Sequence, residues 1–371
     1  MSSTADLTAA ELDRYADLLA EAKAIKGVSL GKDAWRRLRK NYAAMASLGF
    51  LISIGLLALM TPLLPLQSPV AQDLSNRQFL PPNSGAMSLD LVKLIGEEKY
   101  DDEVKTQFNN PNAFDRMLIR IRLAIFGDWC VPSICGTDNL GQDIFARLFW
   151  GARVSLIVGI VATLVSLAIG VSYGAIAGYF GGRIDDVMMR IVDVLYSIPF
   201  IFVVIFLLTF LNAPEIKAKM REYNIDQIVV FYLMIGAIYW LTMARVVRGQ
   251  VISIKNEQFV EAARAIGATR MRIIFRHLVP NLLSIVIVYL SLTIPAVMLF
   301  EAFLSFLGLG VSPPDVSWGL LANDGIQVIT PIKIYWWLVL FPGLALAMTL
   351  FALNFLGDGL RDALDPRMKN R

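Results

Sequence analysis

The 371-residue chain contains little charge, one histidine and two cysteines. Asp, Glu, Lys and Arg together make up 18% of the residues. The single histidine, His277, allows neither a histidine metal cluster nor an imidazole relay, and it leaves no imidazole to spare for a catalytic triad. Two cysteines cannot supply a set with metal-ligand spacing. The sequence therefore predicts no catalytic residue and no metal site.

A strong net charge and a nucleotide-binding loop are missing as well. The net charge is only +3, and no Lys/Arg tract is interleaved with aromatics, which excludes a nucleic-acid surface. The nearest approach to G-x-x-x-x-G-K-[ST] begins at Gly27, but it is one residue short and ends in Asp33 instead of a magnesium-binding hydroxyl. We expect Asp33 to cap a helix beginning near Ala34. No cofactor is expected in this chain.

Apolar residues are abundant: they make up 56% of the chain, and the mean hydropathy is +0.58. Such values are typical of an integral membrane protein. A bilayer-spanning helix needs about 20 apolar residues. Six segments meet this length approximately: 44–64, 154–176, 191–211, 227–244, 282–302 and 334–356. The predicted fold is an all-α membrane protein with six transmembrane helices.

The distribution of Lys and Arg predicts the orientation of these spans. Basic residues crowd the start of the first span and the connection after the fourth, and cytoplasmic loops carry such an excess. Both termini are therefore expected in the cytoplasm. The predicted divisions are a cytoplasmic amino-terminal helix and interfacial elbow (1–43), the first span (44–64), an external insert (65–152) and a transmembrane core (153–371) that contains a cytoplasmic loop at 245–281.

The cytoplasmic loop reads as two short amphipathic helices. Phe259, Ala262, Ala263 and Ile266 recur at helical spacing, and Gly267 supplies a left-handed residue that ends the first helix. The second helix is expected to begin at a Thr269 cap, to carry an apolar stripe and to end at Pro280; the stripe comprises Met271, Ile274, Phe275 and Leu278. The pair could lie on lipid headgroups or present its small alanines to a soluble partner.

The same segment resembles the EAA loop of the permeases of ATP-binding-cassette importers. Five positions match at fixed spacing, with His277 and Val279 departing from the general pattern: Glu261, Ala262, Ala263, Gly267 and Pro280. The chain is also similar to the peptide and nickel branch of that family, in its second (C-type) permease, over GTDNLGQD from Gly136, GYFGGRIDD from Gly178, SFLGLGVSPPDVSWG from Ser305 and LGDGLRDALDPR from Leu356. Gln142 stands where arginine is usual.

This resemblance implies a permease subunit in the bacterial inner membrane, without an ATPase site of its own. The implied partners are a second homologous permease, two ATP-binding subunits that hold ATP and magnesium, and an external substrate-binding protein. Glu261, Ala262, Ala263, Gly267, His277 and Pro280 would form the coupling loop. The expected substrates are oligopeptides or dipeptides, with a nickel or metal chelate as the alternative. A secondary carrier is a weaker alternative, because the centres of the spans lack coupling-ion residues.

Four further residues are candidates for the transport pathway. Asp193 lies near the cytoplasmic end of the third span, within reach of water or Arg190, and Glu301 ends the fifth span on the outer side. Glu301 could meet a substrate ammonium or hold the following loop, and we favour a structural role for both acids. Pro199 and Pro295 are expected to kink helices along the pathway.

Two segments lie outside the resemblance. The long outer insert is expected to form a small domain that leans on the bundle, with Cys130 and Cys135 joined in a disulfide as favoured by an oxidising compartment. At the amino terminus, Thr8 and Glu11 predict a capping box for a first helix. An interfacial elbow around Trp35, Leu38 and Tyr42 is expected to lead into the first span.

Overall fold

All regular elements in the described part of the chain are helices. The computed structural model describes residues 30–364 apart from 96, 98, 212 and 224. Five helices there are long and apolar enough to cross a membrane: α3 (Tyr42–Leu59), α6 (Ile144–Phe180), α10 (Gln227–Ile254), α14 (Leu283–Phe306) and α16 (Trp337–Leu364). The predicted all-α membrane fold is confirmed.

The third predicted span, 191–211, is not a straight helix. The chain forms α7 (Gly182–Ser197) and α8 (Phe200–Leu211), which meet at an angle of 82°, so a sixth crossing exists only if the two count as one broken span. Ile198 adopts an extended conformation (ψ 124°). The ring of Pro199 disfavours the α region for the residue before it, which explains why the helix breaks here.

The pair α6 and α10 forms the centre of the bundle. The 37-residue α6 packs along α10 with small residues at the contact. A side chain at Gly170 would place its Cβ 2.6 Å from the Cβ of Met243, and one at Gly174 would overlap the Ala244 carbonyl. These glycines let the two backbones approach closely, as in other membrane helix pairs.

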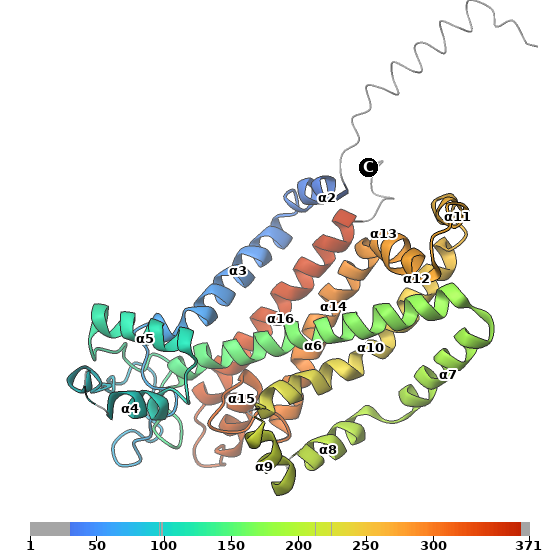
Figure 1. The fold of residues 1–371 in the computed structure, drawn as a ribbon. Coiled ribbons are helices and arrows are strands. Elements are labelled where there is room, and N and C mark those ends of the chain that lie inside the picture. Colours follow the sequence, from blue (N-terminus) through green and yellow to red (C-terminus); the bar gives the residue numbers. More distant parts are fainter. Residues whose placement is uncertain (1–29, 96, 98, 212, 224, 365–371) are drawn as a thin grey trace, which may run out of the picture.

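Short elements gather at two opposite ends of the bundle (Figure 1). One end, called here the loop end, carries α2 and the segments between α10 and α14: α2 (Leu30–Leu38), α11 (Gln258–Ala265), α12 (Arg270–Ile273), the π-helical η3 (Ile274–Leu278) and α13 (Val279–Asn281). The other, the insert end, carries η1 (Thr61–Leu63), η2 (Val92–Leu94), α4 (Lys99–Gln107), α5 (Ala113–Phe126), α9 (Pro214–Glu222) and α15 (Trp318–Gln327).

The start of α3 and the end of α16 meet at the loop end. Leu38 of α2 packs there with Ala44 and Ala363, while Trp35 and Tyr42 stay exposed at 48% and 88%. Such exposed aromatic side chains suit a membrane interface. The predicted capping box at Thr8 and Glu11 lies outside the described residues.

The insert has a hydrophobic cluster of its own, which includes Leu91, Tyr100, Ile119 and Cys130 and packs against Trp150 of α6. The segment from Gly136 joins it to the bundle. Asp143 caps α6 by accepting a hydrogen bond from the Ala146 amide (2.8 Å). Because the cap and the cluster both engage the first turns of α6, the insert is anchored on the bundle and is not a loose loop.

Candidate functional site

The turn between α11 and α12 has the geometry expected of a helix end at glycine. Gly267 has φ +80°, its amide donates to the Arg264 carbonyl (2.9 Å), and the Ala268 amide donates to the Ala263 carbonyl (3.0 Å). These two bonds make a Schellman motif, which satisfies carbonyls at the end of a helix. Thr269 then caps α12 by accepting from the Arg272 amide (3.4 Å). The predicted left-handed glycine and threonine cap are both present.

The buried face of α11 differs from the predicted stripe. Val260 and Ala263 are buried against the second arm of the loop, whereas Phe259, Ala262 and Ile266 are exposed, Ile266 by 83%. Ala263 therefore faces the interior of the protein, and Ala262 is the alanine open to a partner. The predicted stripe combined the buried face with a second apolar face that nothing within the described chain covers.

The second arm divides its apolar residues in the same way. Ile273, Ile274 and Leu278 are at most 1% exposed, while Met271 and Phe275 are 50% and 47% exposed. The exposed apolar residues of both arms, at the loop end, are called here the outer loop face: Phe259, Ala262, Ile266, Met271 and Phe275.

The buried residues of the loop belong to the same hydrophobic cluster as the central helix pair. Val260, Ala263, Ile274 and Leu278 pack together with residues of α6 and α10, among them Val171, Ala175, Val247 and Val251. Interiors of this kind transmit displacement instead of absorbing it. The loop is thus positioned to move together with the centre of the bundle.

The remaining predicted loop residues lie at its edges. Glu261 is exposed on α11, and His277 is half-buried in η3, where its carbonyl accepts from the Asn281 side chain (2.6 Å). Pro280 lies within α13 and does not end the second arm; the π-helical turn before it lets the helix continue to Asn281.

Of the four candidate pathway residues, Asp193 and Glu301 have identified side-chain partners. Asp193 pairs with Arg245 of α10 (2.8 Å), not with Arg190, and both side chains remain partly exposed. Pro199 stands at the break between α7 and α8, and Pro295 is buried inside α14. Glu301 is fully buried and accepts a hydrogen bond from Ser305 (2.7 Å), with Ser155 of α6 at 3.5 Å.

The serines around Glu301 connect it to the chain that follows α14. The hydroxyl of Ser305 also accepts from the Val311 amide (3.3 Å), and the hydroxyl of Ser155 accepts from the Trp318 amide (3.2 Å). Glu301 therefore lies at the centre of a polar cluster that fixes the 307–317 loop against α6. This geometry favours the structural role for Glu301 over contact with a substrate.

The predicted disulfide is absent, since Cys130 and Cys135 are both free thiols. They point into different clusters: Cys130 packs in the insert core, and Cys135 packs beside Ile144 and Trp337. Burial raises the pKa of Cys130, where Arg122 acts in the opposite direction, and it raises the pKa of Cys135 to about 12. Separate packing explains why the short spacing does not produce a bond.

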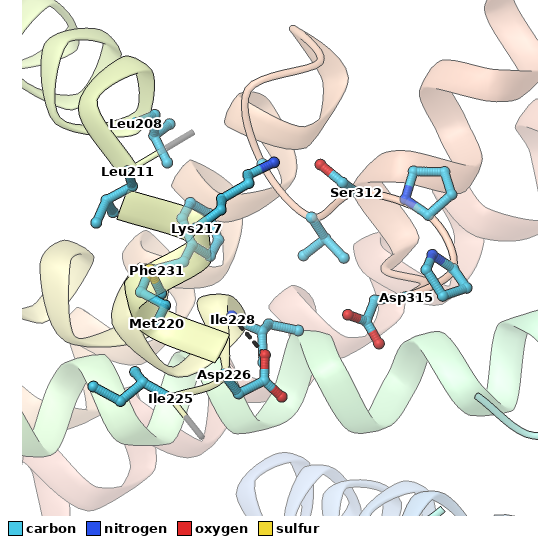
Figure 2. A pocket seen from close by; sticks show the side chains of 14 residues that line it. Leu208, Leu211, Lys217, Met220, Ile225, Asp226, Ile228, Phe231, Ser312 and Asp315 are labelled. Atoms are coloured by element: carbon cyan, nitrogen blue, oxygen red, sulfur yellow. Dashed lines mark hydrogen bonds between the residues drawn. The ribbon is translucent and has the colours of Figure 1, made fainter. Parts of the chain in front are cut away.

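Sequence reasoning missed a cavity of about 410 Å³ at the insert end. Apolar side chains of α8, α9 and α10 form its walls, and Figure 2 shows Asp226 and Asp315 turned toward one another while Lys217 extends toward Ser312. Burial and the neighbouring Asp226 raise the pKa of Asp315, which accepts a hydrogen bond from Asn109 of the insert (2.8 Å). Asp315 lies far from Lys217 and Asp226 in the sequence, so no motif signals the cavity.

Within the described residues, no group of three His, Cys, Asp or Glu side chains could hold a metal ion. Asp33, predicted to cap a helix near Ala34, lies inside α2 instead and pairs with Arg37 (2.7 Å). The helix begins earlier than predicted, so Asp33 occupies its first turn, where a negative charge favours the helix dipole.

Comparison with known families matches two segments of the chain. Residues 170–370 match the family described as the binding-protein-dependent transport system inner membrane component. Residues 29–82 match the N-terminal transmembrane domain of oligopeptide transport permease C.

Curated relatives match most of the chain. The dipeptide transport system permease DppC of Bacillus subtilis is 39% identical over 94% of this chain and 90% of its own length. The oligopeptide permease OppC of Escherichia coli K12 is 38% identical over 92% of this chain and 93% of its own length. The OppC of Haemophilus influenzae is 41% identical over 74% of this chain and 91% of its own length. A chain of the inward-facing methionine ABC transporter MetNI aligns more distantly. It is 19% identical over 58% of this chain and 94% of its own length, with a TM-score of 0.44.

Proposed function

The chain belongs to the inner-membrane components of binding-protein-dependent transport systems, in the branch of the C-type oligopeptide and dipeptide permeases, and from this we propose how it works within a complete importer. It is a multi-pass permease subunit of an ATP-binding-cassette importer for peptides. The similarity to dipeptide and oligopeptide permeases along more than 90% of the chain carries this conclusion. The nickel alternative is not favoured, because these relatives are peptide permeases.

We propose that the outer loop face docks on an ATP-binding subunit. It presents large apolar side chains together with the small Ala262, and an exposed apolar surface suits a protein partner. ATP and magnesium would be held by that subunit. Glu261 is exposed on the same helix and is available to a partner's basic group.

The buried side of the loop would transmit movement of the loop to the central helices. Because Val260, Ile274 and Leu278 share one hydrophobic cluster with α6 and α10, a displacement of α11 by the ATP-binding subunit would shift both central helices. The break at Pro199 would allow α7 and α8 to move together with α6 and α10. In this mechanism the chain provides the pathway and its gate, and nucleotide hydrolysis happens elsewhere.

We propose that the loop end faces the cytoplasm and the insert end faces outward, as the basic residues of the loop indicate. A second homologous permease would complete the pathway, and an external binding protein would approach the insert end. The cavity there combines apolar walls with Lys217 on one side and Asp226 and Asp315 on the other. Opposite charges around an apolar space suit a zwitterionic peptide as it enters.

Uptake in a strain that lacks the gene tests the substrate. A plasmid copy of the gene should restore accumulation of labelled peptides, unlabelled peptides should compete, and nickel salts should not. Restoration of nickel uptake without peptide uptake would contradict the peptide assignment. Thiol labelling with an impermeant reagent at single cysteines, in a background without Cys130 and Cys135, tests orientation: position 110 should react in intact cells and position 262 only after permeabilisation.

A further inference from the structure

A second hollow lies at the loop end, between the end of α6 and the turn of the coupling loop. Its volume is about 530 Å³, within the range of about 300–1,000 Å³ typical of small-ligand sites. The lining residues are Tyr179 and Phe180 of α6 together with Arg264, Ala268, Arg270 and Ile273 of the loop. Two guanidinium groups and two aromatic rings therefore surround one open space.

The aromatic rings hold the two guanidinium groups in place. The guanidinium of Arg264 lies 5.5 Å from the ring centre of Tyr179, and that of Arg270 lies 5.6 Å from the ring centre of Phe180. Nearby, the Lys255 ammonium donates to the Gly178 carbonyl (3.0 Å). Cation–π contacts of this kind orient a positive charge without neutralising it.

The positive charges of this hollow lack a carboxylate partner. Among the described residues, no carboxylate oxygen lies within 4.0 Å of the charged nitrogens of Arg264, Arg270 or Lys255. Asp185, in the first turn of α7, is already bound in two hydrogen bonds by Arg248 (2.6 Å each). The hollow thus retains a net positive charge that an anion can neutralise.

The position of the hollow along α6 matches the headgroup layer. No charged residue occurs between Arg153 and Arg183. A helix rises about 39 Å from Arg153 to Tyr179, close to the roughly 40–45 Å of a bilayer with its headgroups. Aromatic side chains at the end of a span are typical of that interface. Directly after the hollow, Ile184 and Val187 of α7 are exposed by 48% and 61%, an apolar surface suited to acyl chains.

We propose that Arg264 and Arg270, assisted by Lys255, bind the phosphate group of an anionic phospholipid. Guanidinium groups bind phosphate oxygens through charge-assisted hydrogen bonds. Arg264 belongs to α11 and Arg270 to α12, on either side of Gly267, so one bound phosphate bridges both arms of the loop to the end of α6. Given the proposed function of the loop, this lipid supports coupling by holding the turn in place.

A thermal-shift experiment on the full-length chain, purified in detergent with its co-expressed partner subunits, tests the site. Dioctanoyl phosphatidylglycerol should raise the apparent melting temperature by about 2 °C or more, since a ligand of the native state stabilises it. Dioctanoyl phosphatidylcholine should not. The double variant Arg264→Gln/Arg270→Gln should lose the shift, the Arg264→Lys/Arg270→Lys variant should keep most of it, and Arg272→Gln, which alters an exposed arginine outside the hollow, should behave as wild type.

Several results would overturn the lipid site. An equal shift from inorganic phosphate would assign the hollow to a free anion, and an undiminished shift in the double glutamine variant would place the lipid elsewhere. Loss of the ATP-binding subunits from the double variant, with its lipid shift intact, would assign the arginines to subunit docking. Peptide uptake by the wild type is measured alongside; its absence would count against the proposed function and leave the lipid result standing.

Discussion

Replacement of Gly267 by valine tests the proposed role of the Gly267 turn in coupling. At φ +80° the glycine adopts a left-handed conformation, and no atom lies within 4 Å of the place where a Cβ would be. Valine would therefore meet no steric clash with its surroundings, and the whole penalty comes from its own backbone. For a residue with a Cβ this penalty is roughly 1–2 kcal/mol, and the value is higher for a β-branched one.

Rearrangement of the turn out of the left-handed conformation costs about as much free energy. If the turn rearranges, it gives up the bonds from the Gly267 amide to Arg264 and from the Ala268 amide to Ala263, each worth about 1 kcal/mol. By either route about 2 kcal/mol opposes the native geometry of α11, which corresponds to a roughly thirtyfold lower ratio of native to rearranged turns.

The assay is peptide-stimulated ATP hydrolysis by the complete transporter. Gly267→Val should reduce it strongly while leaving binding of the peptide-loaded external protein intact. Gly267→Asn is the matched control, because asparagine adopts the left-handed region far more readily, and it should retain most of the stimulation. Equal, undiminished activity of the valine and asparagine variants would refute the role of the turn in coupling.

Three further predictions concern residues whose surroundings differ. Ala262→Trp, on the exposed face, should weaken association of the ATP-binding subunit without lowering thermal stability, whereas Ala263→Trp, in the cluster core, should destabilise the chain by about 1–3 kcal/mol; the opposite pattern in pull-down and melting experiments would show that the faces are misassigned. Glu301→Ala should lower the melting temperature by leaving the Ser305 and Ser155 hydroxyls without their acceptor, at about 1–3 kcal/mol, while Glu301→Gln keeps most stability and uptake; loss of uptake in a stable glutamine variant would indicate substrate contact instead. Burial raises the pKa of Asp143 to about 6, above its value in the unfolded chain, so the native state binds the proton more tightly and stability should fall as pH rises from about 4 to 6. Asp143→Asn, which can still cap α6, should flatten that part of a melting-temperature profile, and an unchanged slope would contradict this origin.

The sequence predicts the helical fold and the turn of the loop well because both depend on local rules. Long apolar runs identify the spans, and a glycine followed by a threonine predicts the Gly267 turn and the Thr269 cap. The ends of the spans are predicted less accurately than their positions. α10 continues to Ile254, ten residues past its predicted end, because Arg245 and Arg248, which mark a loop by their charge, pair with Asp193 and Asp185 of α7.

Other features depend on contacts that periodicity does not record. The apolar residues of α11 form two faces: one packs against the rest of this chain, and the other stays exposed. Phe259 and Val260 have similar hydrophobicity, although only Val260 is buried. The sequence stays apolar on both sides of Ile198 and Pro199, so hydropathy alone does not reveal the 82° break between α7 and α8. The charged cavity and the arginine hollow bring together residues from segments distant in sequence. Such sites require the tertiary structure.

ATP-dependent peptide accumulation in proteoliposomes tests the central claim most directly. The vesicles would contain this chain, its partner permease and the ATP-binding subunits, with ATP on the side of the loop end and the peptide-loaded binding protein on the other. We expect labelled peptide to accumulate only when ATP is present and this chain is included. Accumulation without ATP, driven instead by a proton or sodium gradient, would contradict the account and identify a secondary carrier.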